Sequence, residues 1–375
     1  MAGWAFGAVG VAAAVVAFGL AGPEARAASS QVWSPFVLVA GLLLVGLVAD
    51  EDGLFASAGE RLSRLAPSGV ALFAGATAAI AVVTALLNLD TSVVFLTPVL
   101  VHAARGRGQD EAPLLIGCLL LSNAGSLLLP GSNLTNLIVL GQLHLSGAEL
   151  FRRMVLPWLV AVVVTALVIA VAERRHLRHR GRRGPAPDGG HPVVIGLGTA
   201  AVIVVGALVL TLRSPALPVA GVGVLVVAVR LIDRREQVGR VLRVLGIPVL
   251  VGLFGIAVAL GTLGRTWSGP ATLLAHLDGV GAAVVAAGAS VLLNNLPAAS
   301  LLASRAPPHP YALLIGLDIG PNLFVTGSLA WILWWRTARA TGSRPPVARA
   351  IVLGLITVPL AMAGALAMVA ATGSL

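Results

Sequence analysis

The chain alternates between long apolar segments and short polar ones, and the apolar segments dominate. A transmembrane helix needs about 20 consecutive apolar residues, and several of these segments reach that length. The pattern therefore predicts an all-α polytopic membrane protein. The apolar segments cover residues 3–21, 34–50, 66–104, 112–142, 154–172, 193–212, 214–232, 244–264, 271–304, 310–336 and 347–371.

Two of these segments, 66–104 and 271–304, are too long for one ordinary membrane span. Polar residues interrupt each of them, as "LLNLDTS" at 86–92 and "LLNNLPAAS" at 292–300. Irregular backbone at membrane depth is tolerated only where it is buried in protein or lines a cavity. We therefore expect two re-entrant helical hairpins whose polar tips lie inside the membrane.

The segment that follows each hairpin is also broken, at 122–136 and at 318–328. The two halves of the chain share "LLN" in the hairpin tips, then "LLIG" and "GS" in the broken segments, in the same order. This order predicts an internal repeat. We expect repeat A at 1–172 (hairpin 66–104, broken helix 112–142), a basic cytoplasmic linker with a connecting helix at 173–213, and repeat B at 214–375 (hairpin 271–304, broken helix 310–336).

The basic residues number 25, all of them arginine, and the formal net charge is +10. They lie between the apolar segments, as the positive-inside rule describes, which disfavours nucleic acid as the partner. A cytoplasmic N-terminus places most arginines inside, with the C-terminus external and repeat B in inverted topology. The first apolar segment resembles a signal peptide but lacks its positively charged start, so we expect a retained helix. Inverted repeats with broken helices are a transporter architecture.

The hairpin tips and the breaks should converge near the middle of the membrane, where freed backbone groups and small polar side chains bind a solute or an ion. Two carboxylates lie at these elements, Asp90 and Asp318. A desolvated carboxylate can exchange protons near neutral pH or bind a cation, so we predict that both are coupling residues. The predicted substrate-binding or ion-binding residues are Asn88, Thr91, Ser132, Asn133, Thr135, Asn294, Asn295, Asn322, Thr326 and Ser328.

Each of these residues also has a structural interpretation. Asn, Ser and Thr often join membrane helices by hydrogen bonds, and the two acids could be salt-bridge or helix-cap carboxylates. Prolines such as Pro130 and Pro321 could only kink helices. The tryptophans at 331–335 are interpreted as an interfacial anchor.

The same stretches resemble the ion transporter superfamily, and within it the arsenite and antimonite permease branch. The resemblance rests on "LNLDTSVVFLTPVL", on "SNLTN" at 132–136, on "NNLPAAS" and on "GLDIGPNLFVTGSLAWILW". Leu89 stands where that family has Asn, and Asn322 stands where the arsenite permeases have Lys. The resemblance implies a secondary active transporter that works by alternating access, with proton-coupled arsenite or antimonite efflux as the leading activity.

The same resemblance leaves two other activities open, a sodium/proton antiporter and a sodium-coupled dicarboxylate or anion transporter. It implies a small inorganic oxyanion or hydroxide, or an organic anion, as substrate, in the plasma membrane. A homodimer and a separate ATPase subunit are further partners that it allows. No G-x-x-x-x-G-K-[ST] motif is present, and we expect no cofactor or metal beyond a coupling ion, H⁺ or Na⁺.

Two other classes of protein were weighed against a transporter. An intramembrane enzyme is disfavoured because the seven histidines fall in loops or near segment ends. Four interrupted polar elements in two matching pairs are not expected in a structural membrane protein. We therefore expect a transporter and not an enzyme.

Overall fold

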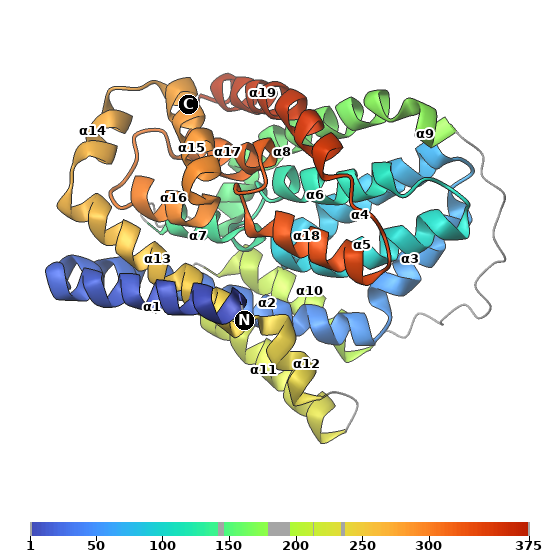
Figure 1. Ribbon diagram of the computed structural model, residues 1–375, viewed down its shortest axis with the longest axis horizontal. Helices are drawn as coiled ribbons and strands as arrows, with labels where there is room; N and C mark the ends of the chain where they lie inside the picture. Colours follow the sequence, from blue (N-terminus) through green and yellow to red (C-terminus); the bar gives the residue numbers. More distant parts are fainter. Residues whose placement is uncertain (1, 142–145, 179–195, 213, 234–236, 374–375) are drawn as a thin grey trace.

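The computed structural model describes residues 2–141, 146–178, 196–212, 214–233 and 237–373, and all regular structure in these ranges is helical (Figure 1). Six of the described helices are long and apolar enough to cross a membrane, and four shorter apolar helices accompany them. Residues 179–195 and 213 of the linker and connecting helix predicted at 173–213 lie outside the described residues.

The first half of the chain folds into two long helices, a short helix, a helical hairpin, a broken helix and another long helix. These elements are α1 (Ala2–Leu20), α2 (Gly22–Glu51), α3 (Leu54–Leu65), the hairpin α4 (Gly69–Leu87) and α5 (Leu89–Gly106), the broken helix α6 (Ala112–Gly125), η1 (Pro130–Ser132) and α7 (Leu134–Leu140), then α8 (Gly147–Ala172) and α9 (Arg174–Arg178).

The second half begins with a connecting helix and then follows a similar order of elements. These are α10 (Leu197–Thr211), α11 (Ala216–Ile232), α12 (Val238–Leu245), α13 (Ile247–Thr266), α14 (Gly269–Ala275), the hairpin α15 (Gly279–Leu293) and α16 (Asn295–Leu302), the broken helix α17 (Pro310–Ile319), η2 (Gly320–Leu323) and α18 (Leu329–Ala340), and α19 (Val347–Ala371).

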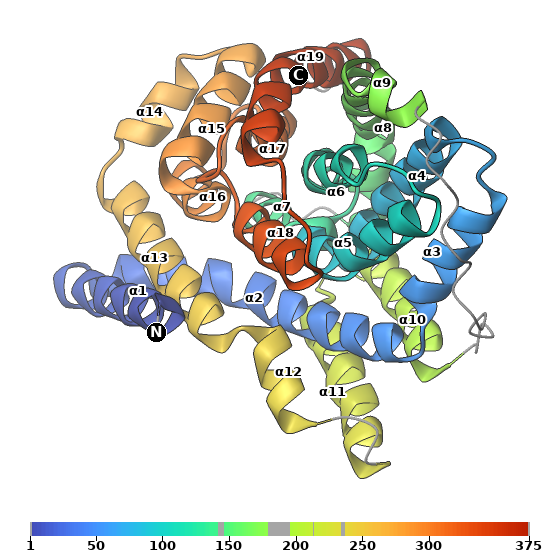
Figure 2. The same cartoon turned by 45° about the vertical axis from the view of Figure 1, so that its right-hand side comes forward.

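The helices of the two halves pack against one another in a reciprocal way. Helix α1 lies along α13, while α11 lies along α2, and α8 and α19 pack together (Figures 1 and 2). Within each half, the first hairpin helix packs on the first part of the broken helix, as α4 on α6 and α15 on α17. Matching elements therefore have matching neighbours in the two halves.

Two boundaries differ from the sequence-based expectation. The second hairpin begins at Gly279 and not at 271, because the short helix α14 and a turn come first and the Asp278 side chain caps α15 by accepting from Gly281 N at 2.7 Å. The helix that contains the second apolar segment begins at Gly22 and not at 34, because the more polar stretch 22–33 is also helical.

The loops that the arginine pattern places on one side of the membrane lie together in the fold. Arg105 donates to the carbonyl of Thr341 at 2.9 Å and to the hydroxyl of Ser343 at 3.1 Å, which joins the α5–α6 loop to the α18–α19 loop. Arg349 pairs with Glu173 at 3.1 Å and so joins α19 to the end of α8. The grouping of these loops at one end agrees with the predicted topology, while the assignment of that end to the cytoplasm remains a prediction.

The carboxylate of Asp52 fixes α10 and α11 against the end of α2. Asp52, directly after α2, pairs with Arg230 of α11 and also accepts a hydrogen bond of 2.6 Å from the backbone N–H of Gly198. A carboxylate at a helix N-terminus stabilises the helix through the exposed N–H groups and the dipole. Asp52 therefore holds α10 and α11 at one end of α2.

Candidate functional site

Each hairpin tip is a single asparagine with an unusual backbone conformation. Asn88 links α4 to α5 with φ of 113°, and Asn294 links α15 to α16 with φ of 77°. Positive φ is uncommon for residues other than glycine, and asparagine tolerates it better than most. The Asn88 Oδ1 accepts from the N–H groups of Asp90 at 2.6 Å and Thr91 at 3.3 Å, so the side chain caps the helix that follows the turn.

The two tips and the two breaks meet around one small cavity of about 20 Å³. Both hairpins, both broken helices and α13 contribute to its wall. Of the predicted site residues, Asp90, Asn133, Asn294, Asn295 and Ser328 line it, and the other lining residues are Leu89, Leu134, Leu253, Leu296 and Leu329. The fold thus brings together residues that lie about 240 positions apart in the sequence.

The cavity combines polar groups on the interrupted elements with an apolar seal. Its volume of about 20 Å³ suffices for a water-sized species, since one water needs roughly 10–15 Å³ on this measure. Amide, hydroxyl and carboxylate groups of the tips and breaks reach it, and Leu253 of α13 closes it. No arginine or histidine is among its lining residues. The site therefore favours a neutral solute or a cation over a polyanion.

Asp318 lies one residue away from this cavity and is fully buried. Its Oδ1 accepts hydrogen bonds from Asn133 Nδ2 at 2.9 Å and from the hydroxyl of Thr135 at 2.6 Å. Its Oδ2 has no hydrogen-bond partner among the described residues. Asn133 also lines the cavity, as Asp90 of the first tip does, so it lies between the cavity and Asp318.

The first break contains further buried oxygens that sequence reasoning did not select. The amide oxygens of Asn123 and Asn136 are buried and have no donor among the described residues. The Asn136 amide nitrogen donates to the carbonyl of Ser126 at 2.7 Å, and the Asn133 amide nitrogen donates to the Ser126 hydroxyl at 3.3 Å. The sequence did offer a signal for Asn123, Ser126 and Asn136, because they are polar residues within an apolar segment and lie in the break at 122–136.

Four predicted site residues of repeat A do not line the cavity: Asn88 and Thr135, whose contacts are given above, and Ser132 and Thr91. The Ser132 hydroxyl donates to the carbonyls of Leu129 at 2.8 Å and Ala85 at 3.3 Å, so it holds the break against α4. Thr91 is fully buried, with its methyl group against Gly46 of α2. Ser132 and Thr91 position the first tip.

Two predicted site residues of repeat B also have other contacts. Asn322 donates to the carbonyl of Leu120 at 2.9 Å and accepts from Asn123 Nδ2 at 2.8 Å, which joins η2 to α6. The Thr326 hydroxyl donates to the carbonyl of Val291 at 2.5 Å, which ties the second break to α15. These residues support the site without lining the small cavity.

The tryptophans at 331–335 are not a simple interfacial anchor, which corrects the interpretation from the sequence. Trp331 and Trp334 are buried and pack edge to face with ring centroids 5.9 Å apart. Their indole N–H groups donate to the carbonyls of Pro321 at 2.9 Å and Leu115 at 2.8 Å. Both therefore belong to the core between the broken helices, and only Trp335 of the three is exposed.

The described residues offer no cluster of three or more His, Cys, Asp or Glu side chains that could hold a metal ion. Cys118 is fully buried in α6, where its sulfur lies 3.4 Å from the Thr97 hydroxyl, and it does not line the cavity. Recognition at the cavity therefore depends on oxygen and nitrogen groups and not on a thiol.

Comparison with known proteins places this arrangement in a family. A profile of the citrate transporter family matches residues 3–334. The arsenical pump membrane protein of Escherichia coli strain K12 is 27% identical over 338 residues, which is 81% of this chain and 78% of that protein. The Yersinia enterocolitica protein of the same name is 26% identical over 339 residues, with 81% and 78% covered.

The fold is similar to a solved transporter structure. The crystal structure of the Alcanivorax borkumensis YdaH transporter, described as having an unusual topology, superposes with a TM-score of 0.57 at 16% identity and covers 92% of this chain and 87% of that one. The chain is thus a multi-pass membrane transporter and not an enzyme. It belongs to the citrate transporter family.

Proposed function

We propose that this protein exports arsenite or antimonite across the plasma membrane in exchange for entering protons. The observation that carries the proposal is the set of polar groups around the cavity at the meeting point of the two tips and two breaks. This cavity, of about 20 Å³, must widen to hold the solute. Its lining groups are amides, a hydroxyl and one carboxylate, with no cationic side chain. Arsenious acid is an uncharged trihydroxide near neutral pH, so its hydroxyl groups can donate to and accept from such groups.

The same lining weighs against a polycarboxylate such as citrate. A bound carboxylate is held by charge-assisted hydrogen bonds, most often from arginine, and a buried unpaired charge is costly. The arginines whose contacts are described here, such as Arg105 and Arg265, bond to groups outside the cavity. The identity of the matched relatives as arsenical pump proteins supports the same substrate.

The two carboxylates suit proton coupling in different ways. Asp90 lines the cavity and can meet the solute directly. Asp318 is sealed from it and is reached through Asn133. The loss or gain of a proton changes the free energy of a buried carboxylate strongly, because a charge in a low-dielectric surrounding is destabilising. We propose that the pair carries the coupling proton.

Sodium coupling is the second candidate, and the oxygens around the first break support it. Asp318 Oδ2 and the amide oxygens of Asn123 and Asn136 are buried acceptors without donors. Carboxylate and carbonyl oxygens are suitable ligands for a hard cation. A sodium ion bound in this region would give such an oxygen a partner.

Everted membrane vesicles test these alternatives together. Proton-driven uptake of arsenite or antimonite into everted vesicles, abolished by a protonophore and unaffected by sodium, is the expected result. Uptake that follows a sodium gradient would favour the second candidate. Uptake of citrate or a dicarboxylate with no uptake of arsenite would contradict the proposed substrate.

A further inference from the structure

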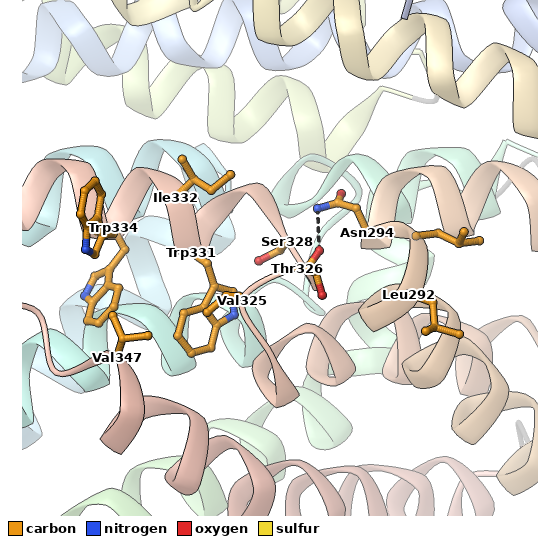
Figure 3. Close-up of a pocket in the computed structure, with 11 residues that line it drawn as sticks. Leu292, Asn294, Val325, Thr326, Ser328, Trp331, Ile332, Trp334 and Val347 are labelled. Atoms are coloured by element: carbon orange, nitrogen blue, oxygen red, sulfur yellow. Dashed lines mark hydrogen bonds between the residues drawn. The ribbon is translucent and has the colours of Figure 1, made fainter. Parts of the chain in front are cut away.

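A second, larger cavity lies beside the tip of the second hairpin. Its volume is about 590 Å³, and it shares Asn294 and Ser328 with the small cavity. Figure 3 shows the wall, which α15, the second break, α18 and the start of α19 provide. The lining residues are Leu292, Leu293, Asn294, Val325, Thr326, Ser328, Trp331, Ile332, Trp334, Trp335 and Val347.

The boundary between the two cavities is polar and tightly tied. The backbone N–H of Asn295 donates to the carbonyl of Gly327 at 2.8 Å, and Asn294 Nδ2 donates to the carbonyl of Thr326 at 3.3 Å. The hydroxyl of Ser328 is buried and has no hydrogen-bond partner among the described residues. A buried polar group without a partner costs about 1–3 kcal/mol, so Ser328 is suited to meet water or a solute that passes between the cavities.

The corresponding tip of the first hairpin is closed. Leu87 and Asn88 each have 1% of their surface exposed, whereas Leu293, which occupies the place of Leu87, is 40% exposed. Leu292, in the place of Leu86, is 83% exposed. The exposures differ although the two tips share the sequence "LLN".

The connecting helix α10 covers part of the first hairpin next to its tip. A side-chain carbon of Leu86 lies 3.4 Å from the position that a Cβ on Gly206 of α10 would occupy. Val209 of the same helix lies next to Gly131 in the first break, at 3.4 Å by the same measure. Helix α10 is held in place by Asp52, as described above. The first tip is therefore covered while the second is open.

We infer that the larger cavity is the aqueous route by which the transported solute reaches the small cavity from one side of the membrane, past Asn294 and Ser328. The route extends toward the end of the fold that holds the α18–α19 loop, because Val347 at the start of α19 is among the lining residues. The arginine pattern predicts that this end is cytoplasmic. The inference rests on the proposed transport function, but not on which solute is carried.

A transporter that kept routes open to both sides at once would dissipate its gradient. A second state must therefore exist in which the exposures are exchanged, with Leu87 accessible and Leu293 covered. The two tips have the same sequence and the same kind of turn, so each can serve as the open one. We assign α10 as the element from which the first tip must separate.

Single cysteines test this route. Leu293→Cys and Leu87→Cys are made in a Cys118→Ser background, with Val284→Cys, on an exposed face of α15, as the matched control. A charged, membrane-impermeant maleimide is applied from either side of reconstituted vesicles of known orientation. We expect position 293 to react only from the side of the α18–α19 loop, and at least about tenfold faster than 87 and 284, because one state dominates.

A proton gradient in the direction that favours the second state should then raise labelling at 87 from the opposite side while it lowers labelling at 293, and the reversed gradient should have the opposite effect. Attachment of a bulky maleimide at 293 should block transport, and the smaller Leu293→Cys change without the reagent should leave it largely intact. Reaction of 293 with a neutral, lipid-soluble maleimide but not with the charged one would show that lipid fills the cavity and would overturn the inference. Equal labelling of 87 and 293 would also overturn it.

The outcome is separable from the substrate proposal. Labelling needs no arsenite, and arsenite transport by the unlabelled protein is measured on its own. The expected labelling pattern without any arsenite transport would leave the route standing and contradict the substrate. Arsenite transport with the wrong labelling pattern would contradict the route alone.

Discussion

The hydroxyl of Thr135 donates a hydrogen bond of 2.6 Å to Oδ1 of Asp318, although the two residues lie 183 positions apart. Thr135 begins the second part of the first broken helix, and Asp318 lies near the end of the first part of the second one. The carboxylate of one half, which we propose as a coupling residue, is therefore held by the break of the other half. Any change of charge at Asp318 acts on both broken helices at once.

Replacement of Asp318 by Asn should separate coupling from binding. Asn keeps the shape of the side chain but cannot titrate, and Asp318 does not line the cavity. We expect proton-driven net arsenite transport to be lost while exchange of arsenite between equal pools is partly retained. Counterflow and gradient-driven uptake, measured on the same vesicles, distinguish the two modes.

Asp90→Asn is the informative partner of that experiment. Asp90 lines the cavity, so we expect this variant to lose both net transport and exchange. A double variant with Asn at both positions that folds and concentrates arsenite at the wild-type rate would refute the coupling role of the pair.

Removal of the Thr135 hydroxyl should weaken transport through Asp318. A hydrogen bond to a charged group contributes about 1.5–3 kcal/mol. Without this donor the carboxylate of Asp318 should hold its proton more tightly. Thr135→Val should therefore lower the proton concentration that gives half-maximal transport by about ten- to a hundredfold. Thr135→Ser keeps the hydroxyl and serves as the matched control. The rate of arsenite uptake as a function of pH provides the measurement, and indistinguishable profiles for Val and Ser would contradict the assignment.

The gross arrangement could be predicted from the sequence because interruptions of apolar segments are costly in a membrane. The "LLN" tips and the "GS" breaks predicted two hairpins and two broken helices, and all four are present in the structure. Asp90 and Asn133 could be selected because a polar side chain in an apolar segment needs a partner or a cavity. The short helices α3, α12 and α14 were missed, since they lack the length that makes a span recognisable.

The direction of each polar side chain could not be predicted. Asn322 and Asn295 are equally polar in the sequence, yet Asn322 turns toward α6 and Asn295 toward the cavity. That choice depends on how the broken helices cross, which composition does not determine. Trp331 was misinterpreted for a similar reason, because its carbonyl partner is created only when Pro321 interrupts the helix.

Leu253 should control access to the small cavity from α13. It is nearly buried and is the residue that α13 contributes to the lining. The larger side chain in Leu253→Phe should fill part of the cavity of about 20 Å³ and so block arsenite transport. Leu263→Phe, on an exposed position of the same helix, should have little effect. Retention of wild-type transport by Leu253→Phe, with normal folding, would exclude this cavity as the binding site.

The orientation in the membrane can be measured with two cysteines. The arginine pattern predicts that the end of α8 is cytoplasmic and that the end of α19 is external. In a Cys118→Ser background, an impermeant reagent added outside intact cells should label Thr372→Cys and leave Arg174→Cys unlabelled until the cells are opened. Both positions are exposed, so the opposite pattern would reverse the assigned orientation.

Replacement of Asn88 should destabilise the first hairpin tip, and the size of the effect should depend on whether the new residue tolerates the backbone conformation. Its φ of 113° and ψ of 154° lie in a region that is almost restricted to glycine. Alanine would keep this strain, about 1–3 kcal/mol, and would also remove the cap from the N–H groups of Asp90 and Thr91. Glycine loses the cap but relieves the strain, so Asn88→Gly should be clearly more stable than Asn88→Ala.

The second tip provides the comparison. Asn294 is more exposed, and its cap on the Leu296 N–H is long at 3.5 Å, so water can replace the side chain there. We expect Asn294→Ala to cost less than Asn88→Ala, which should lower the free energy of unfolding by about 0.5–2 kcal/mol through loss of the cap. Thermal unfolding of the purified variants in detergent measures the order. Equal stability of Asn88→Ala and Asn88→Gly would show that the backbone at the first tip relaxes, and the strain argument would then fail.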